Sequence, residues 1–422
     1  MKICVIGLGY IGLPTAAMFA SSGHTVVGFD VNKKVIEALN QGKVIIEEPY
    51  LEEMVEKAVK QGTLRASDKP EEADAFIICV PTPILPDKSP DLSYVESGVK
   101  VIIPYLKKGN IVILESTSPP GTTRDFMGSI LREAGFNPEE DLYVAYCPER
   151  VLPGKILKEL RENSRVVGGI NEKSAEVVKN LYKSFVEGEI YTSDATTAEM
   201  CKLMENTYRD VNIALANELA MLCEKMGVNA WDVIRFANKH PRVNLHMPGP
   251  GVGGHCIAVD PWFIVSNQPE TAKIINLARN TNDGMPHYVF EKIKNLTSDV
   301  DGVRKVCILG VTYKPDVDDM RESPIIELIH LLTEDKIFET VVVDSHVDYE
   351  GSKDRNLYDA AEGAHLVVLA VNHNEFKNVD FGRIKNAMKC PRVLDTRNFW
   401  DASIVEKEGL EYHLLGWGRH KR

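Results

Sequence analysis

The stretch that decides the fold opens the chain and reads KICVIGLGYIGLP at residues 2–14. An apolar run with strand character ends at Gly7, and Gly9 and Gly12 complete a GxGxxG pattern before a helix-like segment begins. In a strand–turn–helix unit, the first glycine permits the tight turn and the second lets the backbone approach a pyrophosphate. The third lets the helix pack on the strand. The stretch therefore predicts a dinucleotide-binding loop.

A second predicted strand, at 25–30, ends in Asp30 at the distance from the glycines that this motif requires. An aspartate there accepts hydrogen bonds from the adenine ribose hydroxyls and repels a 2′-phosphate, so the sequence favours NAD over NADP. Thr82 and Thr117 each end a predicted strand and are expected to line the cofactor crevice. The alternative for either threonine is a simple strand cap.

Strand and helix patterns alternate through the first half of the chain. Apolar runs at 73–80, 110–117 and 142–149 predict further strands, separated by segments with helical spacing. Strands that alternate with helices predict a parallel, doubly wound sheet. After about residue 195 the pattern becomes helical, and Pro286 is read as a helix break or a first-turn proline.

The strand–glycine pattern returns at 305–319, where a strand into Gly310 resembles the strand into Gly7. The sequence thus predicts an α/β fold, with two Rossmann-like doubly wound parallel-sheet domains joined by a helical central domain. We expect ligands to bind in a cleft between the two sheet domains. The predicted boundaries are 1–192, 193–298 and 299–422.

Composition limits the partners and the compartment. The 422 residues carry a net charge of −12, which disfavours a nucleic-acid partner but permits an anionic small molecule. Because no run of about 18 apolar residues occurs, we expect no membrane span, and we expect no secretory signal. Eight cysteines without a CxxC pair favour free thiols in a reducing cytoplasm. No metal site is expected.

One loop, PGPGVGGHCIAVDP at 248–261, surrounds Cys256 with glycines and prolines. These residues exclude a helix or a central strand over the loop. Glycine-rich backbone offers N–H donors that can stabilise a thiolate or the oxyanion of a carbonyl adduct, with His255 and Asp260 close by. The alternative is a glycine hinge with an incidental thiol.

A polar stripe marks the long helical pattern at 196–227. Lys202, Asn206 and Arg209 fall on one helix face at about 100° per residue, with Glu199 one turn earlier. A buried lysine beside an amide can move a proton or hold a developing charge. The plainer interpretation is a solvated face.

Taken together, these stretches resemble the UDP-glucose/GDP-mannose dehydrogenase family over essentially the whole chain. The matching stretches are VIGLGYIGLP, VPTP, ESTSPPGTT, CPERVLPG, AEMCKLMENTYRDVNIALANE, GPGVGGHC and YKPDVDDMRESP. The resemblance implies an NAD-dependent enzyme that oxidises a primary alcohol of a UDP sugar to a carboxylate. It also implies a homodimer, or a higher homo-oligomer, built on the long helix.

The cysteine loop departs from the glucose enzymes of this family. His255 stands where those enzymes commonly carry serine, and Val259 stands where they carry lysine. This version is similar to the UDP-N-acetylhexosamine branch, which implies UDP-N-acetyl-D-mannosamine as the substrate. UDP-N-acetylglucosamine is the alternative, and UDP-glucose is the more distant one.

The resemblance assigns roles residue by residue. The implied catalytic residues are the nucleophile Cys256 with Lys202, Asn206, Asp260, Glu149 and Thr117. The implied cofactor contacts are Gly7, Gly9, Tyr10, Ile11, Gly12, Asp30, Thr82, Thr117 and Arg321. The implied substrate contacts are Arg150, Val151, Lys202, Asn206, Arg209, His240, Arg242, Gly253, Tyr313 and Lys314.

The implied chemistry is two oxidations at one site, through a thiohemiacetal and a thioester on Cys256. Two rival interpretations remain. A two-electron hydroxyacid dehydrogenase would need no cysteine, and a nucleotide-sensing protein would bind NAD without turning over any sugar nucleotide.

Overall fold

The computed structural model describes residues 1–418 and contains two α/β units. The first unit comprises Met1–Glu205 and Trp262–Gln268, and the second comprises Asn206–Pro261 and the chain from Pro269 onward. The division into two units does not test the three predicted domains, so their boundaries stay a prediction. None of the described helices is long and apolar enough to cross a membrane.

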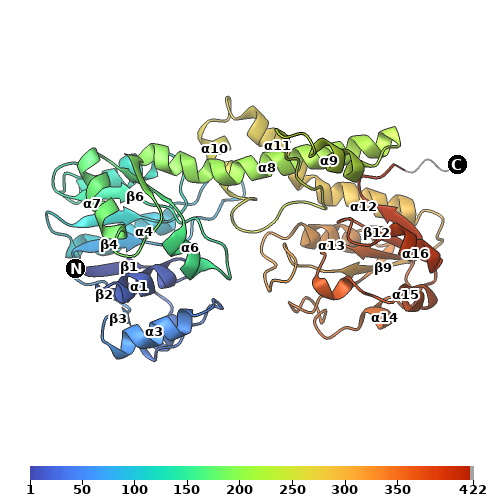
Figure 1. The fold of residues 1–422 in the computed structure, drawn as a ribbon, viewed down its shortest axis with the longest axis horizontal. Helices are drawn as coiled ribbons and strands as arrows, with labels where there is room; N and C mark the ends of the chain where they lie inside the picture. The colour runs from blue at the N-terminus through green and yellow to red at the C-terminus, as the bar shows by residue number, and fades with distance from the viewer. Residues whose placement is uncertain (419–422) are drawn as a thin grey trace. The chain divides into compact units, whose positions relative to one another are not determined.

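An eight-stranded sheet forms the core of the first unit (Figure 1). Its order is β3-β2-β1-β4-β5-β6-β7-β8, and the first six strands follow the order of a dinucleotide-binding fold. All neighbouring strands are parallel except β6 and β7, which pair antiparallel. The strands are β1 (Lys2–Ile6), β2 (Thr25–Phe29), β3 (Leu64–Ser67), β4 (Ala75–Ile78), β5 (Ile111–Leu114), β6 (Tyr143–Tyr146), β7 (Arg165–Gly169) and β8 (Ile190–Asp194).

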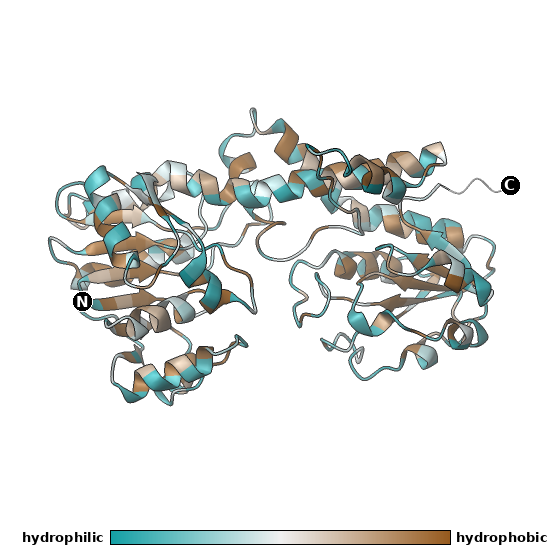
Figure 2. Cartoon of the chain, viewed as in Figure 1, coloured by the Kyte–Doolittle hydropathy of each residue, from teal (hydrophilic) through white to brown (hydrophobic). Residues whose placement is uncertain are grey.

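Helices cover both faces of this sheet, as a doubly wound fold requires. In β1, Ile3 and Val5 pack into one core, whereas Cys4 and Ile6 pack into the other. Burial on both faces explains why the strands read as continuous apolar runs, and they are coloured as hydrophobic in Figure 2. The helices are α1 (Gly12–Ser21), α2 (Lys33–Asn40), α3 (Leu51–Lys60), α4 (Ser93–Ile102), η1 (Ile103–Tyr105), the π-helix η2 (Thr122–Met127), α5 (Gly128–Glu133), α6 (Ile156–Glu162), α7 (Glu172–Tyr182) and α10 (Asp260–Asn267).

Helix α8 (Ala195–Met226) supplies residues to both units and ends just before Gly227, as predicted. The predicted helical middle is present as α8, α9 (Ala230–Ala237), α10, α11 (Lys273–Asp283) and α12 (Met285–Leu296). Pro286 lies in the first turn of α12, where its missing N–H costs nothing. The first-turn interpretation of this proline is therefore confirmed.

A five-stranded parallel sheet forms the core of the second unit, in the order β10-β9-β11-β12-β13. This order corresponds to β2-β1-β4-β5-β6 of the first sheet, without counterparts of β3, β7 and β8, so the predicted second Rossmann-like domain is confirmed. The strands are β9 (Arg304–Leu309), β10 (Phe338–Val343), β11 (Leu366–Leu369), β12 (Arg392–Asp395) and β13 (Glu411–Leu414). The helices around it are α12, α13 (Pro324–Glu334), α14 (Leu357–Ala360), η3 (Asn374–Phe376), α15 (Phe381–Ala387) and α16 (Ala402–Lys407).

Candidate active site

The glycine loop has the geometry of a dinucleotide site. Gly7 has a φ of +91°, and a Cβ there would lie 2.4 Å from the carbonyl oxygen of Cys79. At Gly12 a Cβ would lie 1.9 Å from the Gly7 oxygen, so α1 packs on the turn only with glycine at this position. Among the described residues, nothing lies within 4 Å of a Cβ built at Gly9. The backbone at Gly9 is therefore open to an incoming pyrophosphate.

The N-terminus of α1 fits the same ligand. Within the described part of the chain, no side chain caps this helix, and its first turn holds no acidic residue. Uncapped N–H groups at a helix N-terminus attract phosphate. Ile11 lies at the cap position, and the preceding Tyr10 is exposed.

Asp30 follows β2 directly and is held by two backbone donors. Its Oδ2 accepts the N–H of Leu8 at 2.8 Å, and its Oδ1 accepts the N–H of Asn32 at 2.8 Å. The side chain is half-buried, so both oxygens keep lone pairs that a ribose hydroxyl can reach. The open Gly9 backbone, the uncapped helix and this carboxylate together fit NAD.

The loops after β4 and β5 are joined by side-chain hydrogen bonds. The hydroxyl of Thr82 donates to the carbonyl of Thr117 at 2.6 Å, and the hydroxyl of Ser116 donates to the carbonyl of Val80 at 2.7 Å. The structure thus brings the two predicted threonines together. The prediction that each ends a strand is wrong, because β4 ends at Ile78 and β5 at Leu114. After each of these strands the chain continues as a loop, and the two hydrogen bonds join the two loops.

Lys202 and Glu149 form a buried pair in the first unit. The Nζ atom of Lys202 donates to Oε1 of Glu149 at 3.0 Å and to its carbonyl oxygen at 2.9 Å. The other carboxylate oxygen accepts the N–H of Val151 at 2.8 Å. Because the Lys202 side chain is only 7% exposed, the solvated-face interpretation is wrong at this position. A buried amine beside a carboxylate can pass a proton between them.

The predicted substrate contact Arg150 and the stripe residues Arg209 and Glu199 lie in different surroundings. Arg150 forms a close ion pair with Glu205, whereas Arg209 is exposed. Glu199 is fully buried, and its two oxygens accept the N–H groups of Gly121 and Thr123 at 2.6 and 2.7 Å. Burial raises the pKa of Glu199 to about 7, against these hydrogen bonds, which lower it.

Cys256 is exposed, whereas the other seven cysteines are buried or half-buried free thiols. Burial raises the pKa of Cys4 and Cys147 to about 11 and that of Cys307 to about 12, so these thiols are poor nucleophiles at neutral pH. The expected loop is present from 248 to 259. The prediction is wrong at its last two residues, because Asp260 and Pro261 begin α10.

Asp260 connects the cysteine loop to the long helix. Its N–H donates to the carbonyl of Cys256 at 2.8 Å, and its Oδ2 accepts from the Asn206 amide at 2.6 Å. Asp260 is 3% exposed. The Cys256 backbone, the Asp260 carboxylate and the Asn206 amide therefore belong to one hydrogen-bonded group within the second unit.

The cysteine loop packs on the segment that follows β9. A Cβ built on Gly253 would lie 2.9 Å from the Cβ of Tyr313, and one built on Gly254 would lie 2.8 Å from the Tyr313 ring. The N–H of Gly254 donates to the carbonyl of Arg321 at 3.2 Å. Three residues with predicted binding roles, Gly253, Tyr313 and Arg321, are thus brought together.

The remaining predicted substrate residues are exposed. Lys314, His240 and Arg242 all lie at the surface of the second unit. The N–H of Arg242 donates to Nδ1 of His240 at 3.3 Å, so these two form a local group.

The sequence analysis missed one buried support of the loop. Asn217, on α8, accepts the N–H of Gly249 at 2.9 Å and donates to Asn282 at 2.9 Å. Its polarity within the apolar stretch IALANELAML is the signal that could have revealed it.

Comparison with known proteins agrees with this geometry. The chain matches three domains of the UDP-glucose/GDP-mannose dehydrogenase family: the NAD binding domain at 1–186, the central domain at 196–284 and the UDP binding domain at 307–402. The UDP-N-acetyl-D-mannosamine dehydrogenase of Methanocaldococcus jannaschii is 49% identical over 425 residues, covering 99% of this chain and 97% of that protein. The NDP-N-acetyl-D-galactosaminuronic acid dehydrogenase of Ralstonia nicotianae is 47% identical over 415 residues, covering 96% and 97%.

Solved structures give the same result. The UDP-D-ManNAc dehydrogenase of Pyrococcus horikoshii has a TM-score of 0.92 at 40% identity, with both chains fully covered. The chain matches all three domains of the family, and it covers nearly the full length of these relatives. These matches assign the chain to a family. The chain belongs to the UDP-glucose/GDP-mannose dehydrogenase family, and it is an NAD-dependent UDP-sugar dehydrogenase.

Proposed function

We propose that this enzyme oxidises the C6 alcohol of UDP-N-acetyl-D-mannosamine to a carboxylate in two successive steps. The observation that carries the four-electron chemistry is the exposed Cys256 thiol, on a loop packed against the UDP binding domain. An enzyme that released the aldehyde would need no such nucleophile. NAD, when bound, supplies the hydride acceptor.

In the first step, the C6 hydroxyl loses a proton to a base and its carbon loses a hydride, which gives an aldehyde. We assign the proton transfer to the Lys202–Glu149 pair because these groups are buried and share a hydrogen bond. Cys256 then adds to the aldehyde carbon, so that a C–S bond forms and the carbonyl oxygen takes a proton. The product is a thiohemiacetal.

In the second step, loss of another hydride and of the hydroxyl proton converts the thiohemiacetal into a thioester. Water attacks the thioester carbon, the C–S bond breaks, and the thiol is restored as the carboxylate forms. Glu149, Thr117 and Asp260 are the proposed water-positioning groups. Asn206 holds Asp260 through its amide. Each substrate should therefore yield two NADH.

The choice of sugar rests on the relatives and on the cysteine loop. The M. jannaschii relative is named for the N-acetylmannosamine sugar, and the R. nicotianae relative is named for an N-acetylgalactosamine derivative. Both are acetamido sugars, and His255 with Val259 is the version of the loop that we associate with them. An acetamido pocket binds a 2-hydroxyl sugar poorly, because its polar groups stay unpaired.

An NADH-release assay tests the proposal on four UDP sugars, those of N-acetylmannosamine, N-acetylglucosamine, N-acetylgalactosamine and glucose. We expect the highest kcat/KM with N-acetylmannosamine, weaker use of the other acetamido sugars, and a further loss of roughly 10- to 100-fold with glucose. The highest kcat/KM with UDP-glucose would refute the acetamido assignment. One NADH per substrate with a released aldehyde would refute the thioester route.

We also propose a homodimer that works in the cytoplasm. One stripe of α8 exposes four large apolar side chains, those of Tyr208, Leu215, Leu222 and Met226. An apolar stripe of this kind is typical of a surface that a second copy of the chain covers. Sedimentation at micromolar concentration should give a dimer, and Leu215→Asp should give a monomer. All eight cysteines are free thiols, which suits a reducing compartment.

A further inference from the structure

The second sheet repeats the backbone geometry of the first around a different residue set. The N–H of Gly310, at a φ of +87°, donates to the carbonyl of Val343 at 2.8 Å, just as Gly7 donates to Phe29. Asp344 follows β10 as Asp30 follows β2. Its Oδ2 accepts the N–H of Val311 at 2.7 Å, and its Oδ1 accepts the N–H of His346 at 2.9 Å.

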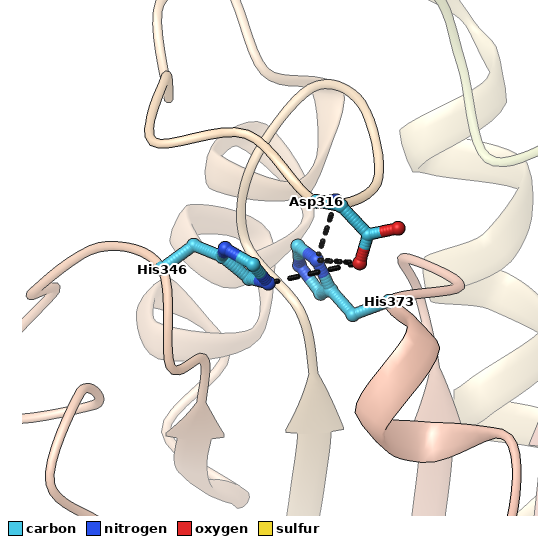
Figure 3. A group of neighbouring side chains, drawn as sticks. All are labelled: Asp316, His346 and His373. Carbon is cyan, nitrogen blue, oxygen red and sulfur yellow. Dashed lines mark hydrogen bonds and ion pairs between the residues drawn. The ribbon is translucent and has the colours of Figure 1, made fainter. Parts of the chain in front are cut away.

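His373 lies beside Asp344, and Figure 3 shows its other neighbours Asp316 and His346. Both His373 and Asp344 are fully buried. The N–H of Asp316 donates to Nδ1 of His373 at 2.9 Å, so Nδ1 carries no proton. Nε2 therefore carries the proton and donates to Asp344 at 3.1 Å, with the Thr312 hydroxyl oxygen at 3.2 Å.

The segment from Thr312 to Pro324, here called the support segment, is fixed at its start by these bonds. The Thr312 hydroxyl donates to the carbonyl of Lys314 at 2.9 Å, which tightens the turn that presents Tyr313 and Lys314. Further along, Tyr313 of the support segment packs against the cysteine loop, and the Arg321 carbonyl accepts the N–H of Gly254 from that loop. The support segment thus contains Tyr313 and Lys314, the proposed nucleotide-binding residues, and it also contacts the loop that holds Cys256.

A metal ion is the other use that this cluster suggests. Asp316, His346 and His373 offer ligand atoms that lie within 4.8 Å of one another. However, the Asp316 N–H takes the Nδ1 lone pair of His373, and Asn374 donates to both carboxylate oxygens of Asp316, at 2.9 and 2.6 Å. The ligand atoms of His373 and Asp316 already have hydrogen-bond partners, so the bonding favours an anchor over an ion.

We propose that His373 is a positioning residue that fixes the support segment and, through it, the cysteine loop. The imidazole links the two elements: it accepts an N–H from the support segment and donates to the carboxylate at the end of β10. The proposal rests on the proposed function in one respect, namely that Tyr313 and Lys314, two of the substrate contacts that the family resemblance implies, bind the nucleotide half of the UDP sugar.

Two variants separate the two bonds of the imidazole. His373→Gln keeps a donor near the Nε2 position but removes the acceptor for the Asp316 N–H. His373→Asn keeps an acceptor near Nδ1 but removes the donor to Asp344. We expect His373→Gln to raise the Kd for UDP about tenfold, because a buried N–H loses its partner and the turn relaxes. His373→Asn should raise it less.

The reactivity of the thiol gives a second measurement. Alkylation of Cys256 by iodoacetamide should be faster in His373→Gln than in the parent enzyme, since the cysteine loop loses support. Thr312→Val removes the hydroxyl that lies 3.2 Å from Nε2 of His373 but keeps the imidazole itself, and it should change both measurements in the same direction. This second variant keeps the test decisive if His373→Gln fails to fold.

His365→Gln is the matched control. His365 is a buried histidine in the same unit, and its Nδ1 also accepts a backbone N–H, from Lys305 at 2.9 Å. This variant should lower the melting temperature but leave the Kd for UDP and the alkylation rate unchanged. Equal effects of His365→Gln and His373→Gln on UDP binding would overturn the proposal.

Two further outcomes distinguish the explanations. If Lys314→Ala weakens UDP binding but His373→Gln and Thr312→Val do not, the positioning role is wrong and the proposed nucleotide site stands. If none of the three weakens it, both are wrong. Stoichiometric Zn²⁺ binding that His346→Ala abolishes would also overturn the proposal, because the ion would occupy the lone pair that the Asp316 N–H uses.

Discussion

Asp30 and Asp344 occupy equivalent points of two sheets, yet their surroundings differ. Each follows the second strand of its sheet and accepts an N–H from the residue after the turn glycine. Asp30 is half-buried and keeps lone pairs toward solvent, whereas Asp344 is fully buried beneath His373. The same backbone thus presents a ligand-binding carboxylate in one unit and a structural carboxylate in the other.

The turns show the same contrast. GLGYIG at 7–12 aligns with GVTYKP at 310–315, so Thr312 takes the place of Gly9 and Pro315 the place of Gly12. Gly9 leaves open space, whereas the Thr312 side chain is buried and bonded. A fold that repeats its strands need not repeat its ligand, because a few side chains decide whether the edge of the sheet is open.

The largest effect should come from the nucleophile. Cys256→Ser should lower steady-state NADH release at least about 10³-fold, since an alkoxide leaves the acyl intermediate far less readily than a thiolate. NAD binding should not change, because the glycine loop and Asp30 lie in the other unit. Calorimetry with NAD and an assay at 340 nm measure the two quantities. Unchanged turnover would remove Cys256 from the mechanism.

The second prediction tests the two aspartates directly. Asp30→Ala should raise the KM for NAD roughly 10- to 100-fold through lost ribose hydrogen bonds, with little change in melting temperature. Asp344→Ala should instead destabilise the fold, since each buried donor left unpaired costs about 1–3 kcal/mol. If Asp344→Ala raised the KM for NAD at an unchanged melting temperature, the comparison would fail.

A smaller effect is expected from the glycine turn. Gly9→Ala should raise the KM for NAD about tenfold, because the new methyl group pushes the pyrophosphate away from a charge-assisted hydrogen bond. Its melting temperature should stay the same, since the methyl group meets open space among the described residues. Gly12→Ala is the control, because its methyl group would collide with the Gly7 carbonyl and lower the melting temperature. A reversal of these two outcomes would contradict the assigned roles.

Local patterns in the sequence predicted the glycine turn, Asp30, the first-turn Pro286 and the loop around Cys256. Each of these depends on residues close along the chain or on one period of a helix or strand. The strands β3, β7, β8 and β13 were not predicted, because their sequences LRAS, RVVGG, IYTSD and EYHL mix polar residues or glycines with apolar ones and are not continuous apolar runs.

Long-range pairs escaped the sequence analysis for a different reason. Lys202 and Glu149 are 53 residues apart, and His373 and Asp344 are 29 apart. Only the resemblance to a family placed Lys202 and Glu149 at one site, and nothing in the sequence indicated the pair in the second sheet. Whether a polar residue is solvated or buried against a partner depends on contacts that the fold creates.

Two buried carboxyls complete the contrast between the units. Burial tends to raise the pKa of Asp344, but hydrogen bonds from His373 and from the N–H groups of Val311 and His346 outweigh it, so the pKa is lowered. In the first unit, burial dominates and raises the pKa of Glu199 to about 7. Asp344 therefore contributes stability that is lost only at strongly acidic pH, whereas Glu199 titrates near neutrality.

The last prediction follows from the direction of the Glu199 shift. Since the folded protein holds this proton more tightly than the unfolded chain, Glu199 contributes stability below about pH 4.5 that is lost as pH rises to about 7. The loss should be on the order of 3 kcal/mol, because the pKa rises from 4.5 to about 7 and each pKa unit is worth about 1.4 kcal/mol. Glu199→Gln, which cannot ionise, should flatten the dependence of the unfolding free energy on pH between 5 and 8, measured by urea titration. Glu133→Gln, at an exposed glutamate, should leave that dependence unchanged. If Glu199→Gln kept the parent slope, the carboxyl would be ionised throughout, and its bonds to Gly121 and Thr123 would outweigh its burial, as those of Asp344 do.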